Sequence, residues 1–438
     1  MQSKYIYPIF LVALLLHSGY LQAQTSNSLG TFTPYSMFGL GDMVRPGSSF
    51  NRSMGGIGVA LRDNRYINFI NPASITARDS LAFMLDFGVE SQNLYHKNSL
   101  TKSAYNTFNM SHLVFSIPIY KKSAMMVGFV PFSHVGYKFE EKEQRPEYVN
   151  EMGNVVYQHY GEGSINQLFV AAALKVSKNF SIGAQWMYYF GALYRSSNVI
   201  HNSVASYSSI LTNNNLILKS FSGKFGLMYE GLVTNRSVVT AGASVILPSN
   251  LTGEVNRIAT TVTGSMIDTV YQSSLPNTQM QIPAEFSAGV AWNKRYFTES
   301  NLNKWMIGFD FTYQDWTKTT FAATPGVDWI TTAKSSYKVG GEWTPDFFDT
   351  RYMLKHWTYR GGIYHERSYM RVNGQQIAAT GVSLGVSLPV FRYSNMLNVG
   401  IDVGQRGSLK DQSVQERYVL FQLSFSLYDR WFRKIKYE

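Results

Sequence analysis

Apolar and polar residues alternate strictly along many segments of this chain. Residues 421–427 read Phe-Gln-Leu-Ser-Phe-Ser-Leu, and residues 305–313 read Trp-Met-Ile-Gly-Phe-Asp-Phe-Thr-Tyr. A period of two puts successive side chains on opposite faces of a β-strand, whereas a helix repeats every 3.6 residues. The pattern therefore predicts strands with one apolar face and one polar or small-residue face.

Fourteen such segments follow one another, an even number that suits a closed antiparallel barrel. Their predicted bounds are 80–95, 106–120, 123–140, 166–176, 180–198, 214–229, 237–249, 283–293, 304–319, 334–343, 356–370, 379–391, 395–406 and 415–429. Short connections (121–122, 178–179, 392–394) alternate with long polar loops (141–165, 199–213, 250–282, 320–333), and an apolar run at 154–160 is assigned to a hairpin within a loop. Outer-membrane barrels have short periplasmic turns and long external loops, so the first strand is expected to run outward.

Composition favours a membrane barrel over a water-soluble fold. Charged residues make up 15% of the 438 residues, and aromatic residues another 15%, whereas soluble domains carry roughly 25% charge. A β-sandwich or propeller is the soluble alternative, but it would expose charge on the face that here carries Trp, Phe, Tyr, Leu and Val. The chain has no cysteine, which excludes a disulfide scaffold, a thiolate metal site and a cysteine enzyme.

The two ends of the chain lie outside the predicted strands. Lys4, the apolar run 9–16 and a small-residue cleavage site ending at Ala23 predict a secretory signal peptide over residues 1–23. No later stretch has 18 consecutive apolar residues, so we expect an exported protein that is integral to the Gram-negative outer membrane. Residues 430–438 form a basic aromatic tail that suits either an interfacial anchor in the periplasm or a recognition signal for barrel assembly.

Residues 24–79 precede the first strand and carry the most informative motif. A glycine-rich run contains Gly55, Gly56 and Gly58, and Asn71-Pro72-Ala73 follows it just before the barrel. This arrangement resembles the N-terminal region of FadL-type channels for hydrophobic compounds. The segments 33–42 and 160–166 resemble versions found in Bacteroidota. The resemblance implies a fourteen-stranded barrel whose N-terminal segment folds inside it as a plug, or hatch, in which these six residues pack and gate.

The resemblance implies two different functions. The first is passive passage of hydrophobic compounds across the outer membrane, without a cofactor or nucleotide, with outer-membrane lipid or a hydrophobic small molecule as the partner. The alternative is a non-catalytic accessory barrel of a protein secretion or assembly machine, such as the type IX secretion system or the β-barrel insertase. Its partners would be another outer-membrane barrel or surface lipoproteins, and neither function involves nucleic acid.

Eight charged residues within the strands occupy the parity that faces the lumen. They are five acids and three bases: Asp86, Lys224, Glu285, Asp310, Lys338, Glu342, Arg360 and Asp402. Mixed signs predict salt-bridged packing against a plug rather than an ion-selective path. Pro118, Pro131 and Pro389 also fall inside strands, where proline removes a ladder hydrogen bond, so each marks either an ordinary bulge or an opening in the wall.

Catalysis is not expected from the sequence. The chain contains no Gly-x-Ser-x-Gly elbow, no His-Glu-x-x-His motif, no phosphate-binding loop and no metal-ligand spacing. Ser111 and His112 are adjacent, and neighbouring strand residues point to opposite faces, so a direct pair between them is not expected. An outer-membrane lipase is therefore the least favoured of the three functions.

Overall fold

The computed structural model describes most of the chain. The described residues are 29–79, 82–98, 101–120, 123–201, 207–234, 237–263, 265–276, 280–294, 303–319, 321, 328–346, 351–390, 395–409 and 414–430. The predicted signal peptide (1–23) and all but the first residue of the predicted tail (430–438) lie outside these residues.

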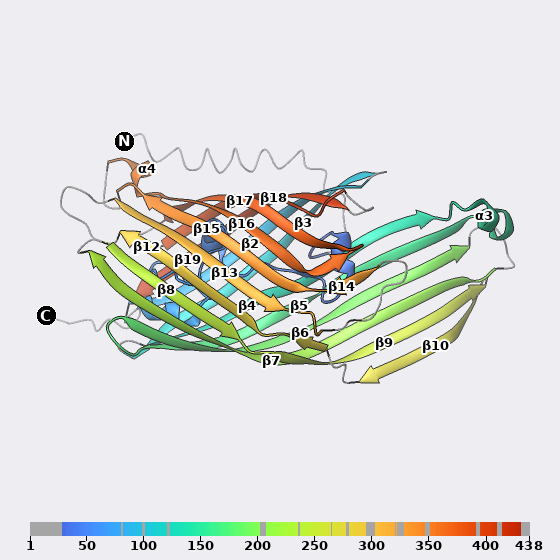
Figure 1. Cartoon of the computed structure of the whole chain (residues 1–438), viewed down its shortest axis with the longest axis horizontal. Coiled ribbons are helices and arrows are strands. Elements are labelled where there is room, and N and C mark those ends of the chain that lie inside the picture. Colours follow the sequence, from blue (N-terminus) through green and yellow to red (C-terminus); the bar gives the residue numbers. More distant parts are fainter. Residues whose placement is uncertain are drawn as a thin grey trace.

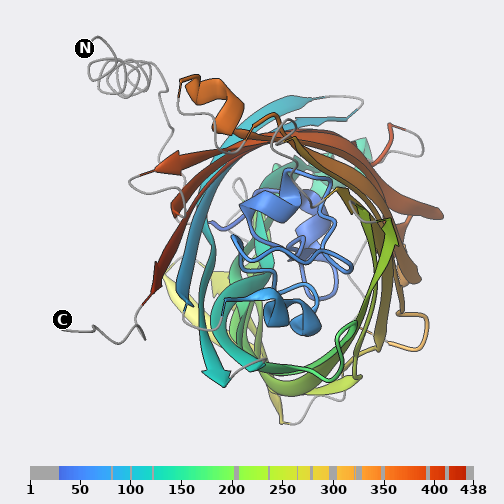
Figure 2. The same ribbon diagram turned by 90° about the vertical axis from the view of Figure 1, so that its left-hand side faces the viewer.

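Fourteen antiparallel strands close into a barrel (Figure 1, Figure 2). They are β2 (Ala82–Lys97), β3 (Lys102–Tyr120), β4 (Ser123–Lys142), β5 (Val155–Lys175), β6 (Phe180–His201), β7 (Ser209–Thr234), β8 (Ser237–Ile246), β12 (Glu285–Lys294), β13 (Lys304–Asp315), β15 (Ala333–Thr344), β16 (Thr358–Val372), β17 (Gln375–Val390), β18 (Asn395–Arg406) and β19 (Gln415–Arg430). Each pairs with the next, and β19 returns to β2 with Phe425 opposite Phe87, which closes the wall. The predicted fold class and strand number are confirmed.

The exterior of this wall is apolar, as the alternation predicts. Exposed side chains of neighbouring strands form continuous aromatic and aliphatic surfaces, for example Trp186 of β6 stacked on Phe221 of β7 with ring centroids 5.2 Å apart. Within the part of the chain that the structure describes, no helix is both long and apolar enough to cross a membrane.

The sequence prediction was wrong about two of the long loops. Residues 154–160 do not form a separate hairpin, because residues 155–160 are the first part of β5 and pair with β6. Most of 250–282 is also strand: β9 (Ser249–Thr263), β10 (Met266–Pro276) and β11 (Met280–Ile282). In addition, the predicted loop 320–333 contains the short strand β14 (Trp329–Thr331), which pairs with β16.

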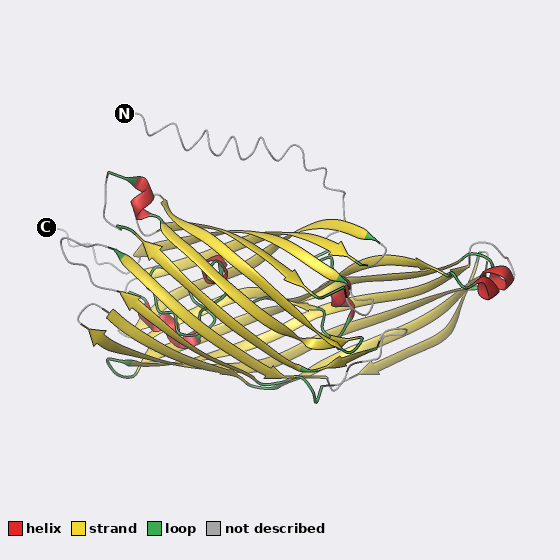
Figure 3. Cartoon of the chain, turned by 45° about the horizontal axis from the view of Figure 1, so that its top comes forward, coloured by secondary structure: helices red, strands yellow, loops and turns green. Residues whose placement is uncertain are grey.

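Of these additional strands, β9 and β10 belong to a sheet that extends beyond the barrel rim (Figure 1, Figure 3). β8 ends at Ile246, and β9 continues the pairing with β7, so that residues 252–262 lie opposite 209–219. We call this sheet the fin, and it consists of residues 133–142, 155–165, 191–201, 209–219, 249–263 and 266–276. The helix α3 (Pro146–Met152) lies at its tip, at the end of the barrel that has the long connections.

Residues 29–79 lie inside the barrel (Figure 2). We call them the hatch. They form short elements only: η2 (Pro34–Met37), β1 (Asp42–Met43), α2 (Ser49–Arg52) and η3 (Pro72–Ala77). Most hatch side chains are buried, including Tyr35, Phe50 and Tyr66. At the opposite end from the fin, the helix α4 (Met353–His356) lies in the connection between β15 and β16.

Candidate functional site

The Asn-Pro-Ala motif docks against two wall glycines. Gly183 of β6 and Gly226 of β7 lie opposite each other in the ladder. A Cβ added to Gly183 would lie 2.5 Å from the backbone nitrogen of Ala73, and one added to Gly226 would lie 2.0 Å from Oδ1 of Asn71 and 2.9 Å from the ring of Pro72. Only glycine at these wall positions lets the hatch approach so closely.

The Asn71 side chain connects the hatch to itself and to the wall. Its Oδ1 accepts from the backbone N–H of Ala73 at 3.0 Å, which caps η3. Its Nδ2 donates to the carbonyl of Val59 at 2.8 Å and to the carbonyl of Leu227 on β7 at 3.1 Å. Pro72 begins η3, where a missing N–H costs nothing. The amide therefore satisfies buried backbone groups that water does not reach.

The three glycines of the glycine-rich run at 55–58 have different roles. Gly55 and Gly56 adopt φ angles of 71° and 84°, a region that favours glycine. The N–H of Gly55 donates to Ser383 of β17 at 2.7 Å. The N–H groups of Gly58 and Val59 both donate to one oxygen of Asp310 on β13, at 2.6 and 2.8 Å. The glycine-rich run thus brings backbone donors to a buried carboxylate.

Further wall glycines make room for the hatch backbone. At each, an added Cβ would come within 2.3 Å of a hatch atom: Gly242 at Val59, Gly340 and Gly362 at Met54, and Gly385 at Ser53. This inward-facing glycine set was not predicted, although these residues occupy the lumen-facing parity of their strands. Together they fix the depth at which the hatch sits.

Ion pairs join the hatch to the wall at several points. Arg45 contacts Asp402 of β18 at 2.7 Å, and Arg52 contacts Glu90 of β2 at 2.6 Å. The hydroxyl of Tyr364 donates to the same Asp402 at 2.6 Å. All these groups are buried or nearly so, and a buried charge without its partner is strongly destabilising.

A second charged cluster lies where the hatch meets β13, β15 and β16. Lys304 contacts Asp63 at 2.7 Å, while Arg65 and Arg360 both contact Glu342 at 3.3 Å. Burial alone would raise the pKa of Asp63, but the neighbouring Arg65 and Lys304 hold it well below its ordinary value. The cluster is therefore charged and interlocked rather than an open ion path.

The structure places all eight predicted lumen charges on the inner side of the wall. Besides Asp310, Glu342, Arg360 and Asp402, it pairs Lys338 with Glu366 at 3.4 Å and Asp86 with His112 at 3.3 Å. Glu285 lies 3.9 Å from Lys334, and Lys224 lines the same cavity as these two. Their hatch partners Arg45 and Arg65 are not recognisable from sequence, because they are hundreds of residues away along the chain.

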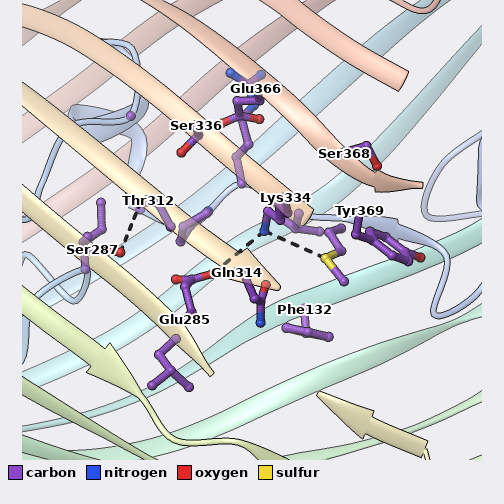
Figure 4. A pocket seen from close by; sticks show the side chains of 18 of the residues that line it. Phe132, Glu285, Ser287, Thr312, Gln314, Lys334, Ser336, Glu366, Ser368 and Tyr369 are labelled. Atoms are coloured by element: carbon purple, nitrogen blue, oxygen red, sulfur yellow. Dashed lines mark hydrogen bonds and ion pairs between the residues drawn. The ribbon is translucent and has the colours of Figure 1, made fainter. Parts of the chain in front are cut away.

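A cavity of about 200 Å³ lies between the hatch and the wall (Figure 4). Engineered cavities of about 150 Å³ hold a benzene molecule. One part of its lining is apolar, with Phe69, Ile70 and Met187, and another carries polar groups such as Lys334 and Gln314. The ammonium group of Lys334 lies 3.9 Å from Glu285 and 3.9 Å from the sulfur of Met43. Figure 4 shows Lys334 with Phe132 and Tyr369 nearby. The cavity suits a small molecule that has an apolar part and a part that can meet charged side chains.

The barrel wall has an unpaired stretch beside this cavity. β3 pairs with β4 only where residues 113–120 of β3 lie opposite residues 123–129 of β4. Residues 102–112 of β3 pair with β2 alone, and residues 130–142 of β4 pair with β5 and not with β3. Pro131 lies at this separation, at a register shift against β5, so it marks both a bulge and the opening. Pro118 lies at a shift in the β3–β4 ladder, and Pro389 stays in regular register with β18. Ser111, Val130 and Phe132 border the opening and also line the cavity.

The first part of the hatch fills this opening. β1 pairs with β4 so that Asp42 lies opposite His134 and Met43 opposite Ser133. The N–H of Thr33 donates to the carbonyl of Gly136 at 2.8 Å. On the β3 side, Phe32 stacks on Tyr105 with ring centroids 3.5 Å apart. Residues 29–44 therefore replace the missing strand pairing.

The expectation that Ser111 and His112 cannot pair was wrong. Ser111 is the extra residue of a bulge in the β2–β3 ladder, so both side chains face inward, and Ser111 Oγ lies 2.9 Å from Nδ1 of His112. Nε2 of His112 lies 3.3 Å from Asp86. In serine hydrolases the serine bonds to Nε2 and the acid to Nδ1, so this row of Ser111, His112 and Asp86 has the reverse orientation.

Among the described residues, no group of three or more His, Cys, Asp or Glu side chains could hold a metal ion.

Comparison with solved structures identifies the fold. The chain is similar to the toluene transporter TodX of Pseudomonas putida (11% identity, 89% of this chain and 100% of that chain, TM-score 0.58) and to the toluene transporter TbuX of Ralstonia pickettii (14%, 87% and 98%, 0.56). A FadL homologue of Pseudomonas aeruginosa matches at 12% identity over 88% and 99%, with a TM-score of 0.53. At these identities the likeness concerns the fold.

No curated protein matches the sequence. Residues 5–438 match the BamG family, and the chain therefore belongs to that family.

Proposed function

We propose that this barrel is a passive route for hydrophobic compounds across the outer membrane. The observation that supports it most directly is the position of the cavity, which lies beside the unpaired stretch between β3 and β4. A compound that leaves the cavity there would enter the hydrocarbon layer without crossing the polar lumen. Burial of apolar surface favours this transfer, so no energy source is required.

The route requires movement of residues 29–44, because they fill the opening. These residues are held to β4 by few backbone hydrogen bonds, whereas the Asn71 and Gly58 regions are fixed deeper in the lumen. We propose that the first part of the hatch is the moving gate and that Gly55, Gly56, Gly58, Asn71, Pro72 and Ala73 hold the rest in place. The fold that this chain shares with two proteins described as toluene transporters supports a route for hydrophobic compounds.

Bound cargo tests the proposal. The barrel would be purified from native envelopes in mild detergent, and extracted lipids and small molecules identified by mass spectrometry. Ser287 lines the cavity, so Ser287→Phe should fill it and remove the cargo. Thr252→Phe, at an exposed position of the fin, is the control and should retain it. Equal cargo in both variants, or none in the native protein, would refute the proposal.

A second function, an accessory barrel of an outer-membrane secretion or assembly machine, is favoured by the fin. The barrel closes without β9 and β10, because β8 pairs directly with β12, and β10 carries large exposed apolar side chains. The same purification separates the two functions. A stoichiometric complex with a larger barrel or surface lipoproteins, in place of bound cargo, would support the accessory role.

We also propose the following cellular placement. Residues 1–23 are removed as a signal peptide, residues 24–79 form the hatch, residues 80–429 form the barrel in the Gram-negative outer membrane, and residues 430–438 lie at the periplasmic interface. Neither function requires catalysis, and the reversed orientation of His112 between Ser111 and Asp86 supports a structural role for this row.

A further inference from the structure

The fin is an open sheet with two edges, and the described residues cover only part of one of them. The strand order across the fin is β4, β5, β6, β7, β9, β10. At the β4 edge, the extended hatch segment adds as a short strand through β1 and the Thr33–Gly136 hydrogen bond. At the opposite edge, β10 pairs with β9, and no other described strand pairs with it.

The β10 edge is long and exposed on both faces. Met266, Ile267, Val270 and Tyr271 are 78%, 72%, 65% and 53% exposed. Its 11 residues contain a single charge, Asp268, and a bulge at Val270. Natural sheets usually protect such an edge with lysines, short strands or a covering element. An edge that keeps its apolar side chains and unpaired backbone groups is suited to adding a strand.

We propose that β10 is a docking site for an extended segment of a second protein at the cell surface, which adds to the fin as a seventh strand. The unpaired N–H and C=O groups require a partner in extended conformation, since only a strand presents a matching row. The exposed side chains on both faces require apolar or uncharged residues in that partner. The hatch segment at β4 shows the same mode of closure within this chain.

A second copy of this chain fits the edge less well. Two copies inserted in one membrane point the same way, so their β10 strands run in the same direction and can pair only as parallel strands. Parallel pairs are slightly less stable for each residue than antiparallel ones. A different protein carries no such restriction, and its segment can run antiparallel to β10.

The proposal can be tested by placing a photo-crosslinker at successive positions of β10 in the cells that produce this chain. Ile267, Thr269 and Gln272 pair with Val262, Thr260 and Ile258, so all three lie on one face despite the bulge. Each would be replaced in turn by a photoreactive phenylalanine analogue, and the crosslinked residue in the partner mapped by mass spectrometry. We expect one partner segment, with the crosslinked position moving about two residues toward its N-terminus at each step.

The controls separate strand addition from general proximity. With the photoreactive residue at Gln272, Ile267→Lys together with Thr269→Lys should abolish the adduct, because lysines block edge pairing. Asn213→Lys places a single lysine at an exposed position of β7, an interior strand of the fin, and should leave the Gln272 adduct intact. The heat-dependent gel mobility of each variant verifies barrel folding. Adducts without a regular register, adducts to a second copy of this chain, or no adduct would each overturn the proposal.

Discussion

Gly226→Ala is the sharpest perturbation of the contact between hatch and wall. The new methyl group would lie 2.0 Å from Oδ1 of Asn71, whereas an ordinary contact begins at 3.4 Å. The amide must therefore retreat by more than an ångström. That shift breaks its hydrogen bonds to Ala73, Val59 and Leu227, which measure 3.0, 2.8 and 3.1 Å.

The expected magnitude follows from those three bonds. Each contributes about 1 kcal/mol net, so hatch docking should weaken by about 3 kcal/mol, which is roughly a hundredfold in the opening equilibrium. Overpacking would add about 1–3 kcal/mol. Hydrogen exchange followed by mass spectrometry, on the folded barrel in detergent, should show hatch peptides that include Gly58 exchanging at least a hundredfold faster.

A matched control lies three residues away on the same strand. A Cβ at Gly223 would meet Leu247 at 3.5 Å, an ordinary contact, so Gly223→Ala should leave hatch exchange unchanged. Asn71→Ser removes most of the amide's hydrogen bonds without adding bulk and should accelerate exchange in the same direction. If Gly226→Ala exchanged like the native protein or like Gly223→Ala, the reasoning about hatch docking would be refuted.

Three further predictions concern buried polar groups. Arg45→Met leaves Asp402 buried without its cation and should weaken hatch docking by about 3–5 kcal/mol. Adding Asp402→Asn should restore much of the lost stability in a double-mutant cycle measured by thermal unfolding, and no recovery would contradict the ion pair. Asp310→Asn should weaken the docking of the Gly58 region by about 1–2 kcal/mol, because the acceptor loses its charge, and Asp310→Ala should weaken it further. Hydrogen exchange of the Gly58 amide measures the effect, and equal exchange in the native protein and both variants would argue against this contact. A fluorophosphonate probe should not label Ser111; labelling that disappears in Ser111→Ala would show that the serine is a nucleophile after all.

The barrel could be predicted from sequence because lipid imposes a strict alternation on every spanning strand. The same reasoning missed β9 and β10, since residues such as Met266 and Ile267 are exposed on both faces of the fin and need not alternate. It also missed the inward orientation of both Ser111 and His112. One inserted residue shifts the register of β3, and a bulge of this kind leaves no signal in the hydrophobic pattern.

The candidate site was only partly predictable. Parity indicated which charges face the lumen, but not that Asp402 meets Arg45 or that Asp310 meets the amide of Gly58, because those contacts depend on how the hatch is threaded. Pro131 is one of three strand prolines that the sequence allows as either a bulge or an opening in the wall. β4 can separate from β3 at that point because β1 takes the place of the missing partner strand. The hydrophobic pattern of one strand carries no information about such a replacement.

The most direct test of the proposed route is to lock the gate with a disulfide. Met43 and Ser133 lie opposite each other in an antiparallel pair, a spacing of roughly 4.5–5.5 Å between Cα atoms that a disulfide can span. The native chain has no cysteine, so Met43→Cys with Ser133→Cys creates the only possible link. Uptake of the hydrophobic dye N-phenyl-1-naphthylamine by cells that contain the oxidised barrel should fall to the level of cells without it. Reduction should restore uptake, and either single variant should behave like the native barrel. Uptake that is the same in the oxidised and reduced double variant would contradict the proposed route.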